Sequence, residues 1–124
     1  MIDVVKHALV QIPGPPDQII CLLQPTQVLR TPAHVQAAID LLQESGADSV
    51  VSVVALPLSQ SPDLLCEIEP SGRLAGWEHE YVGRYQATRR QDARPAYLRD
   101  GTAYCFWRRT VEQQGSLYGM DCRP

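Results

Sequence analysis

The spacing of apolar residues predicts two helices in the first half of this chain. One apolar stripe indicates a first helix, which the proline-rich run at 13–16 must end: Ile2, Val5, Leu9 and Ile12. A second helix is predicted to begin after Thr31, whose hydroxyl suits an N-cap, with Pro32 at the first helical position, and to close at Gly46. The predicted buried face of this second helix consists of Val35, Ala38, Ile39 and Leu42.

Short runs of apolar and β-branched residues predict strands on either side of the second helix. Residues 18–23 form the first run, and residues 49–55 form the second, with nearly continuous apolar content. A strand, a helix and a strand within this length indicate a βαβ unit with a right-handed crossover.

The pattern changes after Pro57. Strand-like residues at 64–69 and near Leu74 flank the turn at 70–72, which predicts a hairpin, and a polar, arginine-rich passage covers 77–99. Residues 101–108 return to strand character and precede a short helix at 109–113. The remainder, 115–124, is predicted to be a loose tail.

Composition is that of an ordinary globular domain. The chain has 124 residues, 44% hydrophobic and 20% charged, which suits one domain with its own core. It has no apolar run of transmembrane length and no signal-peptide pattern at the N-terminus, so we expect no membrane association and a cytoplasmic location. The cysteines are widely spaced, with no histidine at ligand spacing, and are predicted to be reduced, mostly buried and without metal: Cys21, Cys66, Cys105 and Cys122.

Charge is distributed unevenly between the two halves. Residues 1–72 contain two basic and eight acidic side chains, whereas residues 73–124 contain nine arginines and six acidic side chains. The second half is therefore the better candidate for binding an anion. Arginines and tyrosines cluster between residues 81 and 99, which leaves a nucleic-acid-binding module open, although the net charge of -3 disfavours it.

Two separated segments carry a resemblance to a known family. Residues 24–30 read Gln-Pro-Thr-Gln-Val-Leu-Arg, and residues 89–104 contain an Arg-Gln, a Pro-x-Tyr and a Gly-x-x-Tyr group in order. Residues 45–53 and 115–119 continue the likeness. Together these segments resemble the acylneuraminate-type cytidylyltransferases, which activate sialic acid and related acid sugars.

The resemblance implies a fold, a segment for dimerisation and the lack of a catalytic site. We expect an α/β fold, a minimal three-layer Rossmann-like nucleotidyltransferase sheet that is mostly parallel and lacks the first strand. Residues 1–124 would form a single domain truncated at both ends, and residues 64–99 a hairpin and arm for homodimerisation. The family's glycine- and basic-rich phosphate loop and its Asp-x-Asp metal motif are not found in the sequence. CTP and Mg²⁺ are thus implied by the family alone, and we expect no catalytic or metal-binding residues in this chain and no catalysis by the chain on its own.

The resemblance also yields candidate substrate-binding residues. Arg90 could grip the carboxylate of an acid sugar through its forked guanidinium, while Gln24 and Tyr104 could hydrogen-bond to hydroxyls. Asp100 stands where the family has Asn, and adds a negative charge beside the expected anion site. Arg30 is expected to anchor its own loop by hydrogen bonds to carbonyl groups.

Three of these residues also have a simpler structural interpretation, and the chain as a whole has two alternative functions. Arg90 could be a solvated arginine, Gln24 a turn cap, and Tyr104 a core aromatic with its hydroxyl at the surface. The chain could also be a subunit of a split nucleotidyltransferase completed by another polypeptide, or an arginine-rich interaction module.

Overall fold

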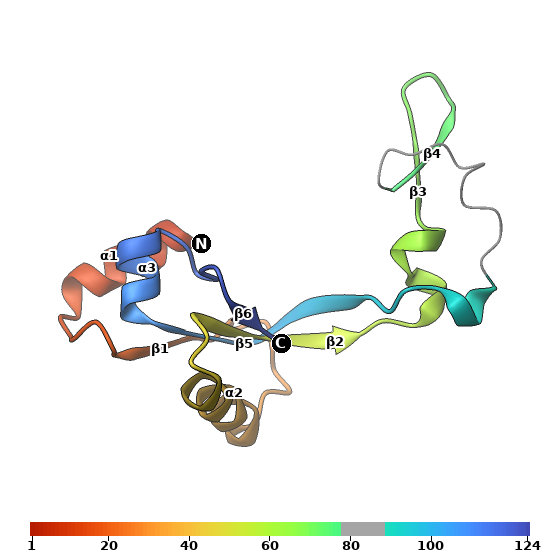
Figure 1. Ribbon diagram of the computed structural model, residues 1–124. Helices are drawn as coiled ribbons and strands as arrows, with labels where there is room; N and C mark the ends of the chain where they lie inside the picture. Colours follow the sequence, from red (N-terminus) through yellow and green to blue (C-terminus); the bar gives the residue numbers. More distant parts are fainter. Residues whose placement is uncertain (78–88) are drawn as a thin grey trace. The chain divides into compact units, whose positions relative to one another are not determined.

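The computed structural model describes residues 1–77 and 89–124, which divide into two compact units (Figure 1). Unit 1 comprises residues 1–53 and 99–124, and unit 2 comprises residues 54–98. The mixed α/β class predicted from the sequence is confirmed. No helix within the described ranges has the length and apolar character needed to cross a bilayer.

A four-stranded sheet in the order β1-β5-β2-β6 forms the centre of unit 1. Its strands are β1 (Ile19–Leu22), β2 (Ser49–Ala55), β5 (Tyr97–Trp107) and β6 (Cys122–Arg123). β1 pairs antiparallel with β5, and β6 pairs parallel with β2. The backbone N–H of Trp107 donates to the Asp48 carbonyl, and the backbone N–H of Ala103 donates to the Ser52 hydroxyl, so β5 also runs antiparallel to β2.

The expectation of a mostly parallel sheet is therefore not met, since the sheet is mixed and mostly antiparallel. The reason is the path of β5, which returns along the sheet and inserts between β1 and β2. These two strands still run in the same direction with α2 between them in the chain, so the predicted strand-helix-strand order exists without direct pairing of its strands.

Helices cover both faces of this sheet, α1 and α3 on one side and α2 on the other (Figure 1). α1 spans Ile2–Gln11, α2 spans Pro32–Ser45 and α3 spans Arg108–Gln114, each close to its predicted range. α2 begins with the predicted proline and ends at Gly46, whose φ of 67° is in the left-handed region that glycine favours. α1 ends where the proline-rich run begins, and the buried guanidinium of Arg108 donates to the carbonyls of Leu9 and Ile12 at that end.

Two apolar clusters fill the space between the helices and the sheet. The larger cluster, on the α1 and α3 side, contains Val5, Leu9, Val51, Tyr104, Phe106, Val111 and Leu117. The other, on the α2 side, contains Ala38, Leu42, Val50, Ala103 and Cys105. Successive residues of β5 alternate between the two clusters, as the pleat of a strand requires.

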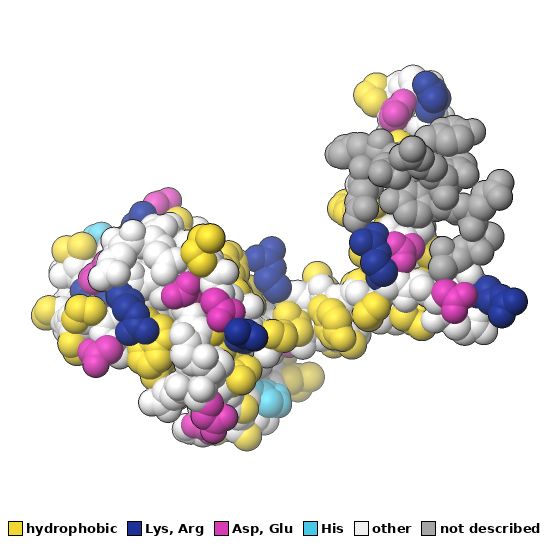
Figure 2. All heavy atoms as spheres, viewed as in Figure 1, with side chains coloured by type: hydrophobic (Ala, Val, Ile, Leu, Met, Phe, Trp, Pro, Cys, Tyr) yellow, Lys and Arg dark blue, Asp and Glu magenta, His cyan; other side chains and the backbone are white. Residues whose placement is uncertain are grey.

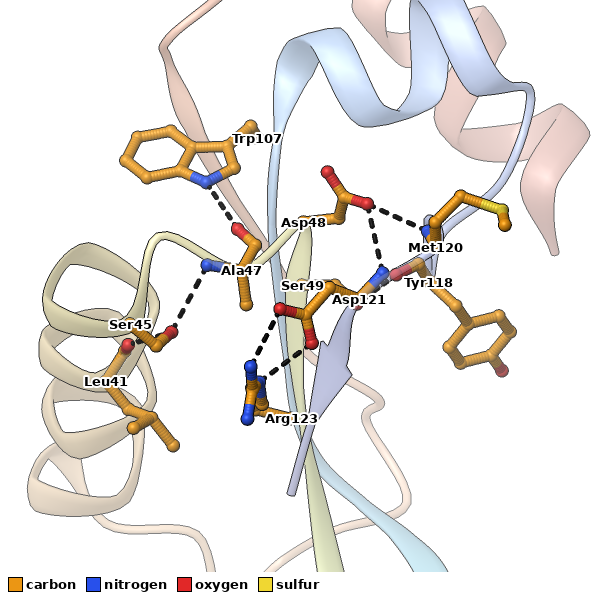
Figure 3. Close-up of polar contacts among 10 residues, drawn as sticks. All are labelled: Leu41, Ser45, Ala47, Asp48, Ser49, Trp107, Tyr118, Met120, Asp121 and Arg123. Atoms are coloured by element: carbon orange, nitrogen blue, oxygen red, sulfur yellow. Dashed lines mark hydrogen bonds and ion pairs between the residues drawn. The ribbon is translucent and has the colours of Figure 1, made fainter.

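The turn between α2 and β2 holds the C-terminal tail in place (Figure 3). The Asp48 carboxylate accepts hydrogen bonds from the backbone N–H groups of Met120 (2.8 Å) and Asp121 (3.1 Å). The Ser49 hydroxyl donates to the Tyr118 carbonyl, and the Trp107 indole donates to the Ala47 carbonyl. The tail predicted to be loose is thus fastened, and it adds β6 to the sheet.

Unit 2 contains the predicted hairpin, formed by β3 (Cys66–Ile68) and β4 (Leu74–Gly76). The described part of unit 2 also contains the short 3-10 helices η1 (Leu58–Gln60), η2 (Pro62–Leu64) and η4 (Arg90–Asp92). Asp63 accepts two hydrogen bonds from Arg94, one from its backbone N–H (2.8 Å) and one from its side chain (2.6 Å). Residues 78–88, which belong to the predicted arginine-rich arm, lie outside the described residues.

Candidate functional site

A pocket of about 390 Å³ opens in unit 1 between α2 and the sheet. This volume is in the range typical of small-molecule sites. The lining combines small apolar residues with a few polar ones: His34, Ala37, Ala38, Leu41, Val50, Ser52, Val53, Asp100, Thr102 and Pro124. Asp100, one of the predicted site residues, is therefore at the pocket wall.

The carboxylate of Asp100 is held in a fixed position by its neighbours. It accepts a hydrogen bond from the Ser52 hydroxyl (2.5 Å), one from the Thr102 backbone N–H (3.0 Å) and one from the Thr102 hydroxyl (2.8 Å). Ser52 also accepts from the backbone N–H of Ala103 (2.9 Å), which ties β2 to β5 at this point. Since each carboxylate oxygen can accept more than one hydrogen bond, Asp100 retains acceptor capacity for a ligand hydroxyl.

The Asp100 carboxylate is also set to stay ionised. Partial burial raises its pKa, but the hydrogen bonds from Ser52 and Thr102 favour the charged form and outweigh burial, so the pKa lies below its ordinary value. The pocket wall therefore carries a fixed negative charge at neutral pH.

The loop at 24–30 is fastened to β5 directly beside this wall. Arg30 donates from Nε to the Thr102 carbonyl (2.6 Å) and from its terminal nitrogen to the Gln24 carbonyl (2.5 Å). The side-chain amide of Gln27 donates to the Asp100 carbonyl. The anchoring role predicted for Arg30 is confirmed, with one of its two carbonyl partners in the loop and the other on β5.

Glycine at position 101 allows this close approach. Gly101 has a φ of 77°, and a Cβ built on it would lie 2.5 Å from the side-chain oxygen of Gln24. Any other residue would both strain the backbone and push Gln24 away. Gln24 therefore packs against the residue that follows Asp100, although it is not among the pocket-lining residues.

His34 contributes a ring to the pocket from the first turn of α2. Its Nδ1 accepts a hydrogen bond from the backbone N–H of Thr31 (3.3 Å), which caps the start of the helix. The Nε2 atom is then the one left to donate to a ligand, because the other ring nitrogen is used as an acceptor.

Tyr104, another of the predicted site residues, does not line this pocket. Tyr104 is only 5% exposed and belongs to the apolar cluster on the opposite face of the sheet, where its ring meets Tyr118 edge-on at 6.4 Å. Of the two interpretations that the sequence leaves open for Tyr104, this placement matches the core aromatic. Arg90 lies in η4 of unit 2, and its side chain lies outside the described residues.

Besides Asp100, the polar residues that line the pocket were not predicted from the sequence as site residues: His34, Ser52 and Thr102. Ser52 did carry a signal, since it is the one polar residue inside the apolar run Val50 to Val54. A hydroxyl in a strand covered on both faces needs a partner, and here that partner is Asp100.

Charged side chains in unit 1 are mixed in sign on the face shown in Figure 2, where Lys and Arg alternate with Asp and Glu. This face therefore offers no single-sign field of the kind that nucleic-acid binding requires.

A scan against protein-family models and a search of curated proteins found no match for this chain.

Proposed function

We propose that this chain is a relative of the acylneuraminate-type cytidylyltransferases that binds an acid sugar or a nucleotide-like anion. The observation that supports this best is the meeting of the two segments that carry the resemblance. The loop at 24–30 and residues 100–102 are far apart in the sequence, yet Gln27 and Arg30 join them through hydrogen bonds to the carbonyls of Asp100 and Thr102.

The fold is compatible with a reduced form of a Rossmann-like sheet. β1 and β2 share a direction and α2 connects them, as in a βαβ crossover. We propose that the sheet descends from such an arrangement, with β5 as its antiparallel member, and that the protein acts in the cytoplasm, where nucleotides are available.

The polar wall of the pocket suits the hydroxyls of a sugar. The Asp100 carboxylate can accept from a hydroxyl, and Ser52 and Thr102 supply hydroxyls of their own close to it. The apolar side chains of the lining suit the carbon face of a sugar ring: Ala37, Ala38, Leu41, Val50 and Val53.

The carboxylate of an acid sugar needs a cation, and among the described residues that line the pocket there is no Lys or Arg. We propose that Arg90 supplies it from the arm of a second copy in a homodimer. Exposed apolar side chains on and beside the hairpin support such an association: Leu64, Leu65, Ile68, Leu74 and Trp77. Sedimentation of the wild type and of Ile68→Asp tests this, and a wild-type monomer at micromolar concentration would contradict it.

Nucleotide transfer depends on a phosphate cradle and a metal site. Neither the glycine- and basic-rich loop nor the Asp-x-Asp motif occurs in the 124 residues, and the described residues contain no cluster of potential metal ligands. We therefore propose that these residues bind without catalysing transfer. Pyrophosphate release from CTP, Mg²⁺ and an acid sugar by the isolated chain would contradict this part.

The binding proposal can be tested with Asp100→Asn, which restores the residue that the family has. Asn keeps the acceptor for Ser52 and removes the negative charge, so N-acetylneuraminate should bind about fivefold more tightly, as expected when repulsion of about 1 kcal/mol is removed. Calorimetry or ligand-observed NMR measures this. Asp17→Asn, an equal charge change at an exposed residue that does not line the pocket, should leave the affinity unchanged.

A second variant tests the cation. Arg90→Gln should weaken binding of N-acetylneuraminate at least tenfold, because a bidentate charge-assisted contact is lost. Binding of the neutral sugar N-acetylmannosamine should stay the same in both variants. Equal affinities for the acid and the neutral sugar in the wild type, or no binding of either, would contradict the proposal.

A further inference from the structure

Two cysteines face each other across the β1 and β5 strand pair. The register aligns Cys21 directly with Cys105, and their sulfur atoms are 3.1 Å apart in a hydrogen bond between thiols. Both cysteines are free. The prediction that the four cysteines are mostly buried is wrong, since Cys105 is buried, Cys21 is half-buried, and Cys66 and Cys122 are exposed.

The backbone of this pair already has a spacing that a disulfide accepts. Residues directly opposite in an antiparallel pair have Cα atoms about 4.5 to 5.5 Å apart. Disulfides occur at Cα separations of about 4.4 to 6.8 Å, so the bond can form without moving either strand. Fixed strands also keep the two sulfur atoms together, which favours closure over reaction with a second external thiol.

The two thiols differ in access and in acidity. Cys105 is fully buried between the sheet and α2, whereas Cys21 is half-buried. The hydrogen bond from Cys105 lowers the pKa of Cys21, and the same contact together with burial raises the pKa of Cys105. Cys21 is therefore the thiol that reacts first, since the thiolate is the nucleophile.

We propose that Cys21 and Cys105 are a redox site that closes to a reversible disulfide by exchange with a low-molecular-weight disulfide. The Cys21 thiolate attacks one sulfur of that disulfide, forms a mixed disulfide and releases one thiolate. Cys105 then loses its proton to solvent and attacks the Cys21 sulfur, which releases a second thiolate. In total, two protein thiols are oxidised, and one external disulfide is reduced to two thiols.

This site is connected to the candidate pocket through the chain. Cys21 lies three residues before Gln24, and Cys105 lies three residues after Thr102. The disulfide would join the two strands whose ends carry the anchored loop and the Asp100 wall. The proposal itself does not depend on which ligand the pocket binds.

The test uses the full chain carrying Cys66→Ser and Cys122→Ser, which removes the two exposed thiols and leaves the pair intact. After reduction, the protein is incubated with oxidised glutathione, and intact mass and free thiols are measured. We expect complete loss of both thiols, a mass lower by two hydrogen atoms, and full recovery with dithiothreitol. Retention of both thiols, or a stable glutathione adduct on Cys21, would overturn the proposal.

Single variants in the same background test the order of the steps. Cys105→Ser should accumulate the glutathione adduct on Cys21, because the resolving thiol is missing. Cys21→Ser should leave Cys105 at least tenfold slower to react than Cys21 does, because Cys105 is buried. Equal reaction rates for the two cysteines would contradict the assigned order. If a single variant does not fold, the chain that carries only Cys66→Ser and Cys122→Ser still decides whether the disulfide forms.

Discussion

The two faces of the sheet in unit 1 are built from side chains of different size. The face under α1 and α3 is filled by large residues such as Phe106 and Leu117, and its cluster contains no alanine. The cluster under α2 includes two alanines, Ala38 and Ala103, and the pocket lies on this side. The same strand, β5, contributes to both faces, so the difference comes from alternate residues of one segment.

This difference shows how a small domain can keep a rigid centre and still have room for a ligand. Large side chains on one face provide the apolar burial that holds the strands in register. Small side chains on the other face leave space, which Ser52 and Asp100 line with polar groups. We therefore expect substitutions in the polar wall of the pocket to lower stability less than substitutions in the packed face.

The largest expected effect comes from Phe106→Ala on the packed face. Phe106 is fully buried, so its removal should lower the free energy of unfolding by about 4 kcal/mol through lost burial and a new cavity. Urea denaturation followed by circular dichroism measures this. A loss below about 1 kcal/mol would show that the two faces do not differ in packing as described.

Arg30→Gln tests the connection between the pocket wall and its loop. The substitution leaves the carbonyls of Gln24 and Thr102 without their charged donor, and we expect a loss of about 2 kcal/mol in the free energy of unfolding. Lys6→Gln on α1 removes the same charge at an exposed position and should change stability by less than about 0.5 kcal/mol. Equal effects of the two substitutions would show that the loop is not fastened by Arg30.

Asp100→Asn should change the dependence of stability on pH. The folded pKa of Asp100 lies below its unfolded value of about 3.9, so its contribution is complete above that value and is lost as the pH falls through the folded pKa. The free energy of unfolding of the variant should therefore fall less than that of the wild type when denaturation is followed from neutral to acid pH. An unchanged acid transition would mean that the hydrogen bonds to Asp100 do not stabilise its charged form.

Tyr104→Phe should have the smallest effect. The ring packs in the cluster opposite the pocket, so loss of the hydroxyl should change stability by less than about 1 kcal/mol and leave the affinity for N-acetylneuraminate unchanged. A tenfold loss of affinity would instead restore Tyr104 as a ligand contact and contradict the assignment of the two faces.

The sequence allowed most local elements to be predicted, because they depend on neighbouring residues. The proline-rich run ends α1, Pro32 and Gly46 bound α2, and the β-branched run from Ser49 forms β2. The direction of β5 and the existence of β6 could not be predicted in this way. Both depend on long-range pairing, and a strand of two residues has no periodicity to detect.

The site was predictable in part for the same reason. The loop at 24–30 and residue Asp100 were identified from their motifs, and they do lie side by side. Tyr104 belongs to the second motif too, and residues four apart share a face of a strand only where the pleat is regular. Gly101, with its left-handed φ, lies between Asp100 and Tyr104, and these two residues are on opposite faces of the sheet. A left-handed residue inside a strand is not evident from residue types alone.

The short β6 strand has a consequence for how this protein behaves at high concentration. It pairs with β2 at Ser49 and Val50, and the Asp48 carboxylate holds the preceding residues in place. Peeling these last residues away would bare backbone donors and acceptors along an apolar strand, which a neighbouring molecule can match. We therefore expect Asp48 to limit aggregation, because it keeps β6 paired along the edge of β2.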